Sequence, residues 1–442
     1  MKDVSKYRLK KVLGLSFGLA VMVGGIIGVG ILRNPGLVAA ILPYKWLIIS
    51  AWFFGGVYVL MALGSLAELA AMLPKAGGTF NYVKRAYGDY PGFVIGWFDY
   101  INNAIAPGYF SIVIAEYLVL LFPATQGYET FIALSALMAF TLLNLTGVKS
   151  ASLTQQITSF IKVFAFLVLV ICCFLLGGYN RSSEEIHSNL SRTVMNGGLF
   201  LAFIKGLQLA LGTYDGWNAP TFMAEEDTNP GKNIPRSLFG GAIIVMIVYV
   251  SINIALLYVL PVSAVAGSQL AVADAAQVIL GKAGYTILLV IALFSLLSIL
   301  NAQMMISSRI LYGLSHEGLF IKKGTLVNKG GTPYVVMIIT ALIGIITISI
   351  GSFERLFSLS AFITVASSIM MFASLFRLRK SEPDLPRPYK AWGYPLIPLL
   401  MLLVSITLFI SYAFADTKNF FVILTITALT WPGYWLIKRR TQ

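Results

Sequence analysis

Two apolar segments of this 442-residue chain are interrupted in a way that exposes backbone groups. The first interruption holds four closely spaced glycines followed by a proline: Gly24, Gly25, Gly28, Gly30 and Pro35. Each glycine weakens a helix by about 1 kcal/mol, so the backbone is free to unwind here. A helix restarting near Ile31 then points free amides and its positive dipole end at the break. This arrangement favours a carboxylate ligand.

Close helix packing is the alternative use of these glycines, because small residues let helices approach one another in membranes. The pattern does not favour a phosphate-binding loop, since the glycines have no strand–helix context.

The second interruption holds Gly212, Gly216 and Pro220 around the polar string Thr213-Tyr214-Asp215-Gly216-Trp217-Asn218. Where a helix unwinds, its carbonyl oxygens lose their partners and can accept hydrogen bonds from an ammonium group. One break that offers amides beside another that offers carbonyls predicts a site for a zwitterion. Asp215 is costly in mid-span, by roughly 2.5–3.5 kcal/mol, so it either caps unwound amides or contacts the substrate.

Among the basic residues within predicted spans, Lys162, Arg33 and Lys205 are candidates for a function. Lys162 is nine residues past Leu153, about 13 Å along a helix. Its ammonium either snorkels to the interface or occupies a cation position between helices. In the second case it replaces a sodium ion, or it loads and releases a proton. Arg33 and Lys205, in the outward halves of the broken spans, either line an outer vestibule or snorkel.

The composition places these residues in a membrane. Hydrophobic residues make up 58% of the chain and charged residues 11%, against about 25% charged in soluble proteins. The net charge of +14 comes from short basic clusters between apolar runs, which excludes a nucleic-acid-binding domain. Cys172 and Cys173 are adjacent, so no disulfide framework is expected. His187 and His316 have no other metal-ligating residues near them in the sequence, so we expect no metal and no cofactor.

Crossing the bilayer takes about 20 apolar residues per helix. By this measure the sequence predicts an all-α integral membrane protein with twelve spans, at 13–41, 46–73, 92–121, 129–147, 153–176, 197–224, 238–260, 285–313, 334–350, 355–377, 394–414 and 420–437. Basic clusters at 2–11, 75–85, 377–390 and 438–440 all fall on one side if the N-terminus is inside. Both termini of this multi-pass cell-membrane protein are therefore predicted to be cytoplasmic.

The two breaks fall five spans apart, which predicts two five-helix repeats of inverted topology. The predicted order is a cytoplasmic N-terminus at 1–12, a first repeat at 13–176, an extracellular loop at 177–196, a second repeat at 197–377, and a cytoplasmic loop with two extra helices at 378–442.

These residues resemble the amino acid–polyamine–organocation superfamily, and within it the L-type amino acid transporters and their bacterial relatives. The resemblance covers nearly the whole chain and rests on GGIIGVGI at 24–31, ELAAMLPKAGG at 68–78, YDGWN at 214–218 with the following Glu225-Glu226, Asn229-Pro230 and KNIPR at 232–236, then Asn301, Ser308-Arg309 and Tyr312, and RPYK at 387–390. It implies the leucine-transporter fold, with helices 1 and 6 unwound, and alternating access.

The resemblance also implies roles for particular residues. The amides of Val29 and Gly30 would hold the α-carboxylate of an amino acid, and the carbonyls of Ile26, Gly212 and Asp215 its α-amine. Lys162 falls where sodium-independent relatives place a lysine. Trp217 and Tyr109 are candidate gate residues, because Gly212 stands where relatives often have an aromatic ring.

The sequence departs from the family after the first break and in the segment where relatives have a cysteine for a partner subunit. Arg33 and Asn34 replace apolar or small residues after the first break. The segment 122–128 has no cysteine, so no disulfide-linked heavy chain is expected.

The sequence thus predicts a sodium-independent secondary amino acid transporter, working by exchange or by proton-coupled uptake. The alternative is a polyamine or other organic amine transporter of the same fold. A membrane enzyme would need clustered catalytic groups and a channel a continuous polar pore, and the pattern favours neither.

Overall fold

The computed structural model describes residues 8–178, 188–350 and 353–441, and these form helices and short connections. Within the described residues no β-strand forms, and one isolated bridge joins Leu13 to Asp227. Helices suit a chain of this composition, because lipid offers no partners to unpaired backbone groups. The predicted loop at 177–196 and the N-terminal segment lie partly outside the described residues.

The helices follow the twelve predicted spans. The first five correspond to α1 (Leu15–Ile26) with α2 (Gly30–Ile41), α3 (Lys45–Met72), α5 (Asp89–Leu121), α6 (Glu129–Thr146) and α7 (Val148–Leu176). The next five correspond to α8 (Ser188–Thr213) with η2 (Ala219–Glu226), α9 (Pro230–Val259), α11 (Ala271–His316), α12 (Tyr334–Ile350) and α13 (Phe353–Ser381). The last two are α14 (Leu396–Ala415) and α15 (Thr417–Thr441).

Both predicted breaks are present. α1 and α2 meet at 46° across the break, and residues 214–218 separate the end of α8 at Thr213 from the start of the 3₁₀-helix η2 at Ala219. Among the described residues nine helices are long and apolar enough to cross a membrane, and the bent α1–α2 pair adds a tenth. The apolar helices Gly198–Thr213 and Tyr334–Ile350 are shorter and coincide with the two remaining predicted spans.

Several elements went unpredicted. α4 (Thr79–Tyr87) lies between α3 and α5, and the short helices α10 (Val262–Ala266), η1 (Pro123–Thr125) and η3 (Lys322–Thr325) occupy loops. α11 begins at Ala271 rather than near residue 285. Gly281, at φ +63°, separates its first ten residues from the spanning part, so a loop helix and a span are joined end to end.

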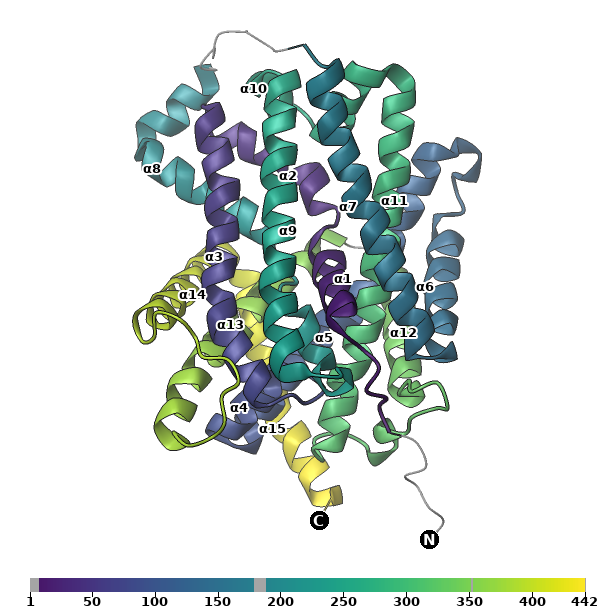
Figure 1. Cartoon of the computed structure of the whole chain (residues 1–442), viewed down its shortest axis with the longest axis vertical. Coiled ribbons are helices and arrows are strands. Elements are labelled where there is room, and N and C mark those ends of the chain that lie inside the picture. The colour runs from purple at the N-terminus through teal and green to yellow at the C-terminus, as the bar shows by residue number, and fades with distance from the viewer. Residues whose placement is uncertain (1–7, 179–187, 351–352, 442) are drawn as a thin grey trace.

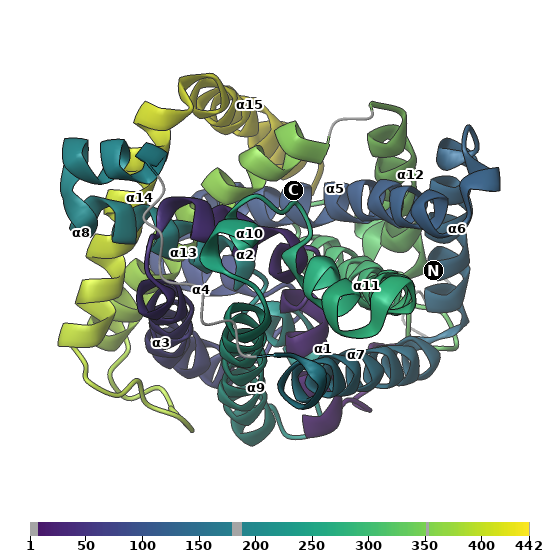
Figure 2. The ribbon, with the colours of Figure 1, turned by 90° about the horizontal axis from the view of Figure 1, so that it is seen from above.

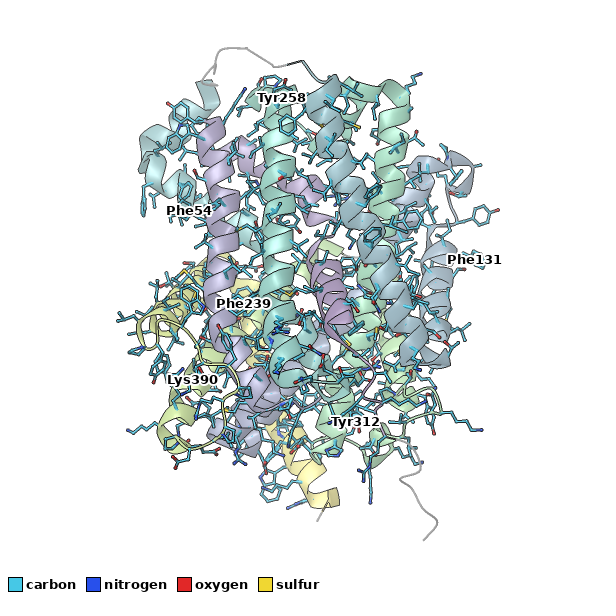
Figure 3. All side chains as sticks on the ribbon, in the orientation of Figure 1. Phe54, Phe131, Phe239, Tyr258, Tyr312 and Lys390 are labelled. Carbon is cyan, nitrogen blue, oxygen red and sulfur yellow. The ribbon has the colours of Figure 1, made fainter. Side chains whose placement is uncertain are left out.

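The broken first span lies at the centre of the bundle. Both chain ends lie at the lower side in Figure 1, which we call the terminal face, and the opposite side the distal face. Seen from above, α1 and α2 are surrounded by the other helices, while α6, α8, α14 and α15 lie at the periphery (Figure 2). Phe54 on α3 and Phe131 on α6 point outward (Figure 3) and are 51% and 69% exposed, as suits contact with lipid.

Candidate functional site

The two helix breaks touch each other. Gly216 has a φ of +95°, which favours glycine, and a Cβ placed on it would lie 2.8 Å from the carbonyl oxygen of Gly25. A Cβ on Gly30 would lie 2.9 Å from a side-chain carbon of Thr213. Close approach at both points requires glycine, so the glycines predicted to unwind the helices also bring the two breaks together.

A cavity of about 1270 Å³, including its open mouth, lies at this junction. Most of the predicted site residues line it: Ile26, Gly28, Val29, Gly30, Arg33, Tyr109, Gly212, Asp215 and Trp217. The Leu32 and Arg33 amides of α2 donate to the Val29 carbonyl oxygen, whereas the Gly30 amide at the start of α2 has no acceptor within its own helix and lies at the cavity wall. The Asp215 carboxylate lies beside the Gly216 amide and the Thr364 hydroxyl.

Tyr214 and Lys205 do not line the cavity. Tyr214 is buried on its other side, where its hydroxyl donates to the Trp52 carbonyl oxygen at 2.9 Å. Lys205 is exposed on α8. Neither residue contacts the space that the other predicted residues enclose.

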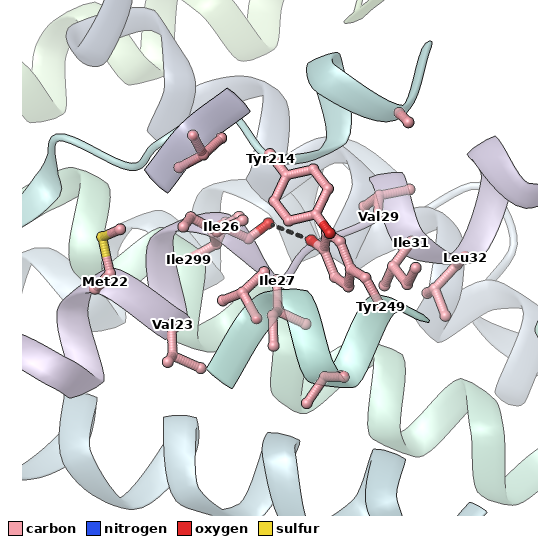
Figure 4. Close-up of a cluster of buried hydrophobic side chains, with 14 of the residues drawn as sticks. Met22, Val23, Ile26, Ile27, Val29, Ile31, Leu32, Tyr214, Tyr249 and Ile299 are labelled. Atoms are coloured by element: carbon pink, nitrogen blue, oxygen red, sulfur yellow. Dashed lines mark hydrogen bonds between the residues drawn. The ribbon is translucent and has the colours of Figure 1, made fainter. Parts of the chain in front are cut away.

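Tyr249 on α9 connects the two breaks and was not predicted. Its hydroxyl lies 3.0 Å from the carbonyl oxygen of Ile26 (Figure 4). It lies 3.2 Å from the carbonyl oxygen of Thr213. A buried tyrosine in an apolar span needs a partner for its hydroxyl, and this is the only signal that the sequence offered. The Ile26 carbonyl therefore already accepts one hydrogen bond and has one lone pair left for a ligand.

Lys162 reaches the first break from α7. Its side chain is fully buried, and Nζ donates to the carbonyl oxygens of Ile27 at 2.6 Å and Gly24 at 3.2 Å. Ser295 Oγ on α11 donates to the same Ile27 oxygen at 3.0 Å. The ammonium thus points into the unwound backbone instead of along the helix to the interface.

A chain of amides and hydroxyls holds α7 against its neighbours beside Lys162. Asn301 Nδ2 donates to Gln155 Oε1 at 2.9 Å, and Gln155 Nε2 donates to Ser298 Oγ at 3.1 Å. Asn144 Nδ2 on α6 donates to Asn301 Oδ1 at 3.0 Å. Such a network fixes the position of Lys162 relative to the break, because each member holds the next.

The rest of the cavity wall is polar and went largely unpredicted. It is formed by residues of α4, α5, α11 and α13, namely Thr79, Asp99, Asn102, Asn103, Gln303, Ser360, Thr364, Ser367 and Ser368. Asp99 and the asparagines lie within a long apolar run that predicted a span but gave no sign of which face meets the cavity. Among the described residues no group of three or more His, Cys, Asp or Glu side chains could hold a metal ion.

Ion pairs close the terminal face. Arg309 and Glu226 form a fully buried pair with nitrogen–oxygen distances of 3.0 and 3.1 Å, joining α11 to η2. Glu68 on α3 accepts from Arg379 at 2.5 Å and from Arg387 at 3.1 Å.

Glu317, just after α11, extends this closure to α4 and the loop before it. It accepts from Lys84 at 2.6 Å and from Lys75 at 2.8 Å. Burial alone would raise the pKa of Glu317, but the two lysines hold that pKa down to about 2. The carboxylate is therefore charged, and both pairs persist, throughout the physiological pH range.

At the distal end the cavity is more open. The Arg33 side chain is 43% exposed and lies 3.9 Å from Glu116, which is 50% exposed. By contrast, Thr79 and Ser367 are buried. The cavity is thus open on the distal side and closed on the terminal side.

A bundle of apolar helices with two broken spans around a central cavity is the leucine-transporter fold. The model of the amino acid permease family matches residues 13–431, and the chain belongs to this family. It is accordingly a multi-pass membrane transporter of the amino acid–polyamine–organocation superfamily, not an enzyme.

The relatives are amino acid transporters from bacteria and mammals. The chain is 26% identical to the serine/threonine exchanger SteT of Bacillus subtilis, over 98% of both chains. It is 28% identical to the b(0,+)-type amino acid transporter 1 of Mus musculus, over 91% of this chain and 82% of that one. It is also 28% identical to the large neutral amino acids transporter small subunit 2 of Rattus norvegicus, over 89% of this chain and 74% of that one. These similarities confirm the predicted resemblance to the L-type amino acid transporters and their bacterial relatives.

Proposed function

We propose that this protein carries amino acids across the cell membrane by alternating access, without sodium. The observation that carries the proposal is the contact of the two broken spans at one cavity, where α2 offers free amides and the neighbouring turns offer carbonyls. Amides facing carbonyls match the carboxylate and ammonium ends of a free amino acid. A polyamine has no carboxylate, so it would leave the amides of α2 unpaired.

In this proposal the Val29 and Gly30 amides bind the α-carboxylate. The free lone pair of the Ile26 carbonyl, with the carbonyls of Gly212 and Asp215, binds the α-amine. All five residues line the cavity. Because the site uses backbone groups for the parts shared by all amino acids, the side chain is selected by the remaining wall.

Sodium independence follows from Lys162. A bound sodium ion would need carbonyl oxygens such as those of Gly24 and Ile27, and the Lys162 ammonium already occupies both. The fixed charge therefore does the work of a bound cation. Movement is then driven by a second amino acid in exchange, as the name of the Bacillus subtilis relative suggests, or by a proton.

The remaining predictions of topology belong to the same proposal. With the terminal face in the cytoplasm, the open side of the cavity faces outward, and the two five-helix repeats, 13–176 and 197–377, alternate its access. No disulfide-linked partner is involved, because Cys172 and Cys173 both lie on α7 and the segment 122–128 has no cysteine.

Uptake into proteoliposomes containing the purified protein alone tests this proposal. We expect saturable uptake of labelled L-amino acids over their D-isomers, at the same initial rate in sodium and in choline. Uptake that requires amino acids inside the vesicle indicates exchange, and uptake driven by an imposed pH gradient indicates proton coupling. Absence of stereoselective uptake, or equal competition by putrescine, would contradict the proposal.

A further inference from the structure

One carboxylate in the cavity wall has an oxygen without a partner. Asp99 on α5 is 4% exposed, and its Oδ1 accepts from Ser367 Oγ at 2.6 Å. The Thr79 hydroxyl lies near the same carboxylate. Its Oδ2 makes no hydrogen bond, and Asp99 belongs to no ion pair within residues 8–178, 188–350 and 353–441.

A second buried acceptor without a partner lines the same cavity. Gln303 Oε1, on α11, accepts no hydrogen bond. One turn later, Ser307 Oγ donates to the Asn103 carbonyl oxygen at 2.6 Å. Asn103 in turn donates its side-chain amide to the Asp99 carbonyl oxygen at 2.7 Å. These bonds hold α11 against the turn of α5 that carries Asp99, so the two acceptors belong to one region of the wall.

The basic residues around the cavity are engaged elsewhere. The Lys162 ammonium donates to two carbonyls of the first break. Arg33 lies at the exposed mouth near Glu116. A buried carboxylate without a counter-charge is unfavourable in a region of low dielectric, and an acceptor without a donor adds to the penalty. A ligand group that donates hydrogen bonds and carries a positive charge would remove both penalties.

We propose that Asp99, with Gln303 and Ser367, forms a subsite for the cationic side-chain group of an amino acid, an ammonium or a guanidinium. The inference rests on the proposed function, because it takes the α-carboxylate of the same molecule to be bound at the first break. Asp215 lines the cavity too, but the buried carboxylate oxygen without a hydrogen bond, among the described residues, belongs to Asp99. Asp99 keeps an oxygen for the ligand. Its ligand donates to Oδ2 while Ser367 continues to donate to Oδ1.

Matched pairs of ligands test the subsite. L-Arginine and L-citrulline have nearly the same shape and differ in a charged guanidinium against a neutral urea, and L-lysine and L-norleucine differ in the terminal ammonium. Affinities come from ligand-dependent thermal shifts of the purified full-length protein. We expect L-arginine to bind about tenfold or more tightly than L-citrulline, as a hydrogen bond between charged groups implies. The same order should hold for L-lysine over L-norleucine.

Asp99→Asn keeps the shape of the side chain and removes its charge. We expect the arginine-to-citrulline ratio to fall to near one in this variant. Asp384→Asn, at an exposed loop position, is the matched control and should keep the wild-type ratio. If Asp99→Asn does not fold, Ser367→Ala must still lower the ratio, since it frees Oδ1 and misplaces the carboxylate.

Two results overturn the inference and leave the proposed function intact. These are a wild-type ratio near one while neutral L-amino acids bind, and an unchanged ratio in Asp99→Asn or, if that variant does not fold, in Ser367→Ala. Failure of every L-amino acid, neutral or cationic, to shift the unfolding temperature would instead overturn the proposed function together with the subsite.

Discussion

Replacement of Lys162 by methionine should abolish transport without preventing insertion. The substitution keeps a long unbranched side chain but removes the ammonium that donates to Gly24 and Ile27 at 3.2 and 2.6 Å. A hydrogen bond to a charged group contributes about 1.5–3 kcal/mol. Ile27 keeps its bond from Ser295, so we take the lower end for both bonds, about 3 kcal/mol in total. That free energy corresponds to roughly a 150-fold change in the population of the unwound first span.

The assay is the initial rate of labelled amino acid uptake into preloaded proteoliposomes, scaled to the amount of reconstituted protein. We expect the rate of Lys162→Met to fall about 100-fold or more, in sodium and in choline alike. Lys149→Met is the matched control, because Lys149 is exposed on the same helix, and its rate should stay within about twofold of wild type. A variant at position 162 that transports at near the normal rate, or a wild-type rate that falls steeply without sodium, would refute the role of Lys162 as a fixed cation.

Three further results are expected. Gly30→Val should abolish uptake, because a Cβ there would lie 2.9 Å from a side chain of the sixth span. Val29→Ala should reduce uptake only mildly, because the backbone amide is kept. Equal damage by both variants in uptake assays would argue against a site made of backbone groups. Gly212→Phe should slow bulky substrates about tenfold more than alanine, since a Cβ at 212 meets open space and the ring fills it. Gly212→Ala is the control, and an equal slowing of all substrates by the ring would count against size selection. Glu226→Ala should lower the free energy of unfolding by about 3–5 kcal/mol, because it leaves Arg309 buried without its partner. Adding Arg309→Met to the Glu226→Ala variant should recover part of this loss. An unchanged melting temperature of Glu226→Ala would exclude a structural role for the pair.

The positions of the spans and of both breaks could be predicted because each is a local property of the sequence. Apolar length predicts a span, and glycines beside polar residues in such a run predict a break. The partners of those residues could not be predicted. Tyr249 and Asp99 each lie in an apolar run, and their meaning depends on which helix packs against them. Tyr249 bridges the two breaks because α9 packs against α1, and Asp99 faces the cavity because α5 packs against α11 and α13.

Tyr214 shows the converse case. Its neighbours in the polar string enter the cavity, but the turn between α8 and η2 rotates successive residues to different sides. Its hydroxyl therefore meets Trp52 instead of the cavity. Membership of a motif does not specify the direction of a side chain once the helix has ended.

The backbone joint ahead of α1 restricts how the terminal face can open. The Leu13 amide donates to the Glu226 carbonyl oxygen at 3.0 Å, and the Leu13 carbonyl oxygen accepts from the Thr228 amide at 2.9 Å. These two bonds join the segment just before α1 to the end of η2. That unit packs against α11 and is also joined to it by the buried Glu226–Arg309 pair. We therefore expect the two inner half-helices to move together when the terminal face opens, so that both ends of a bound amino acid would be released in one step.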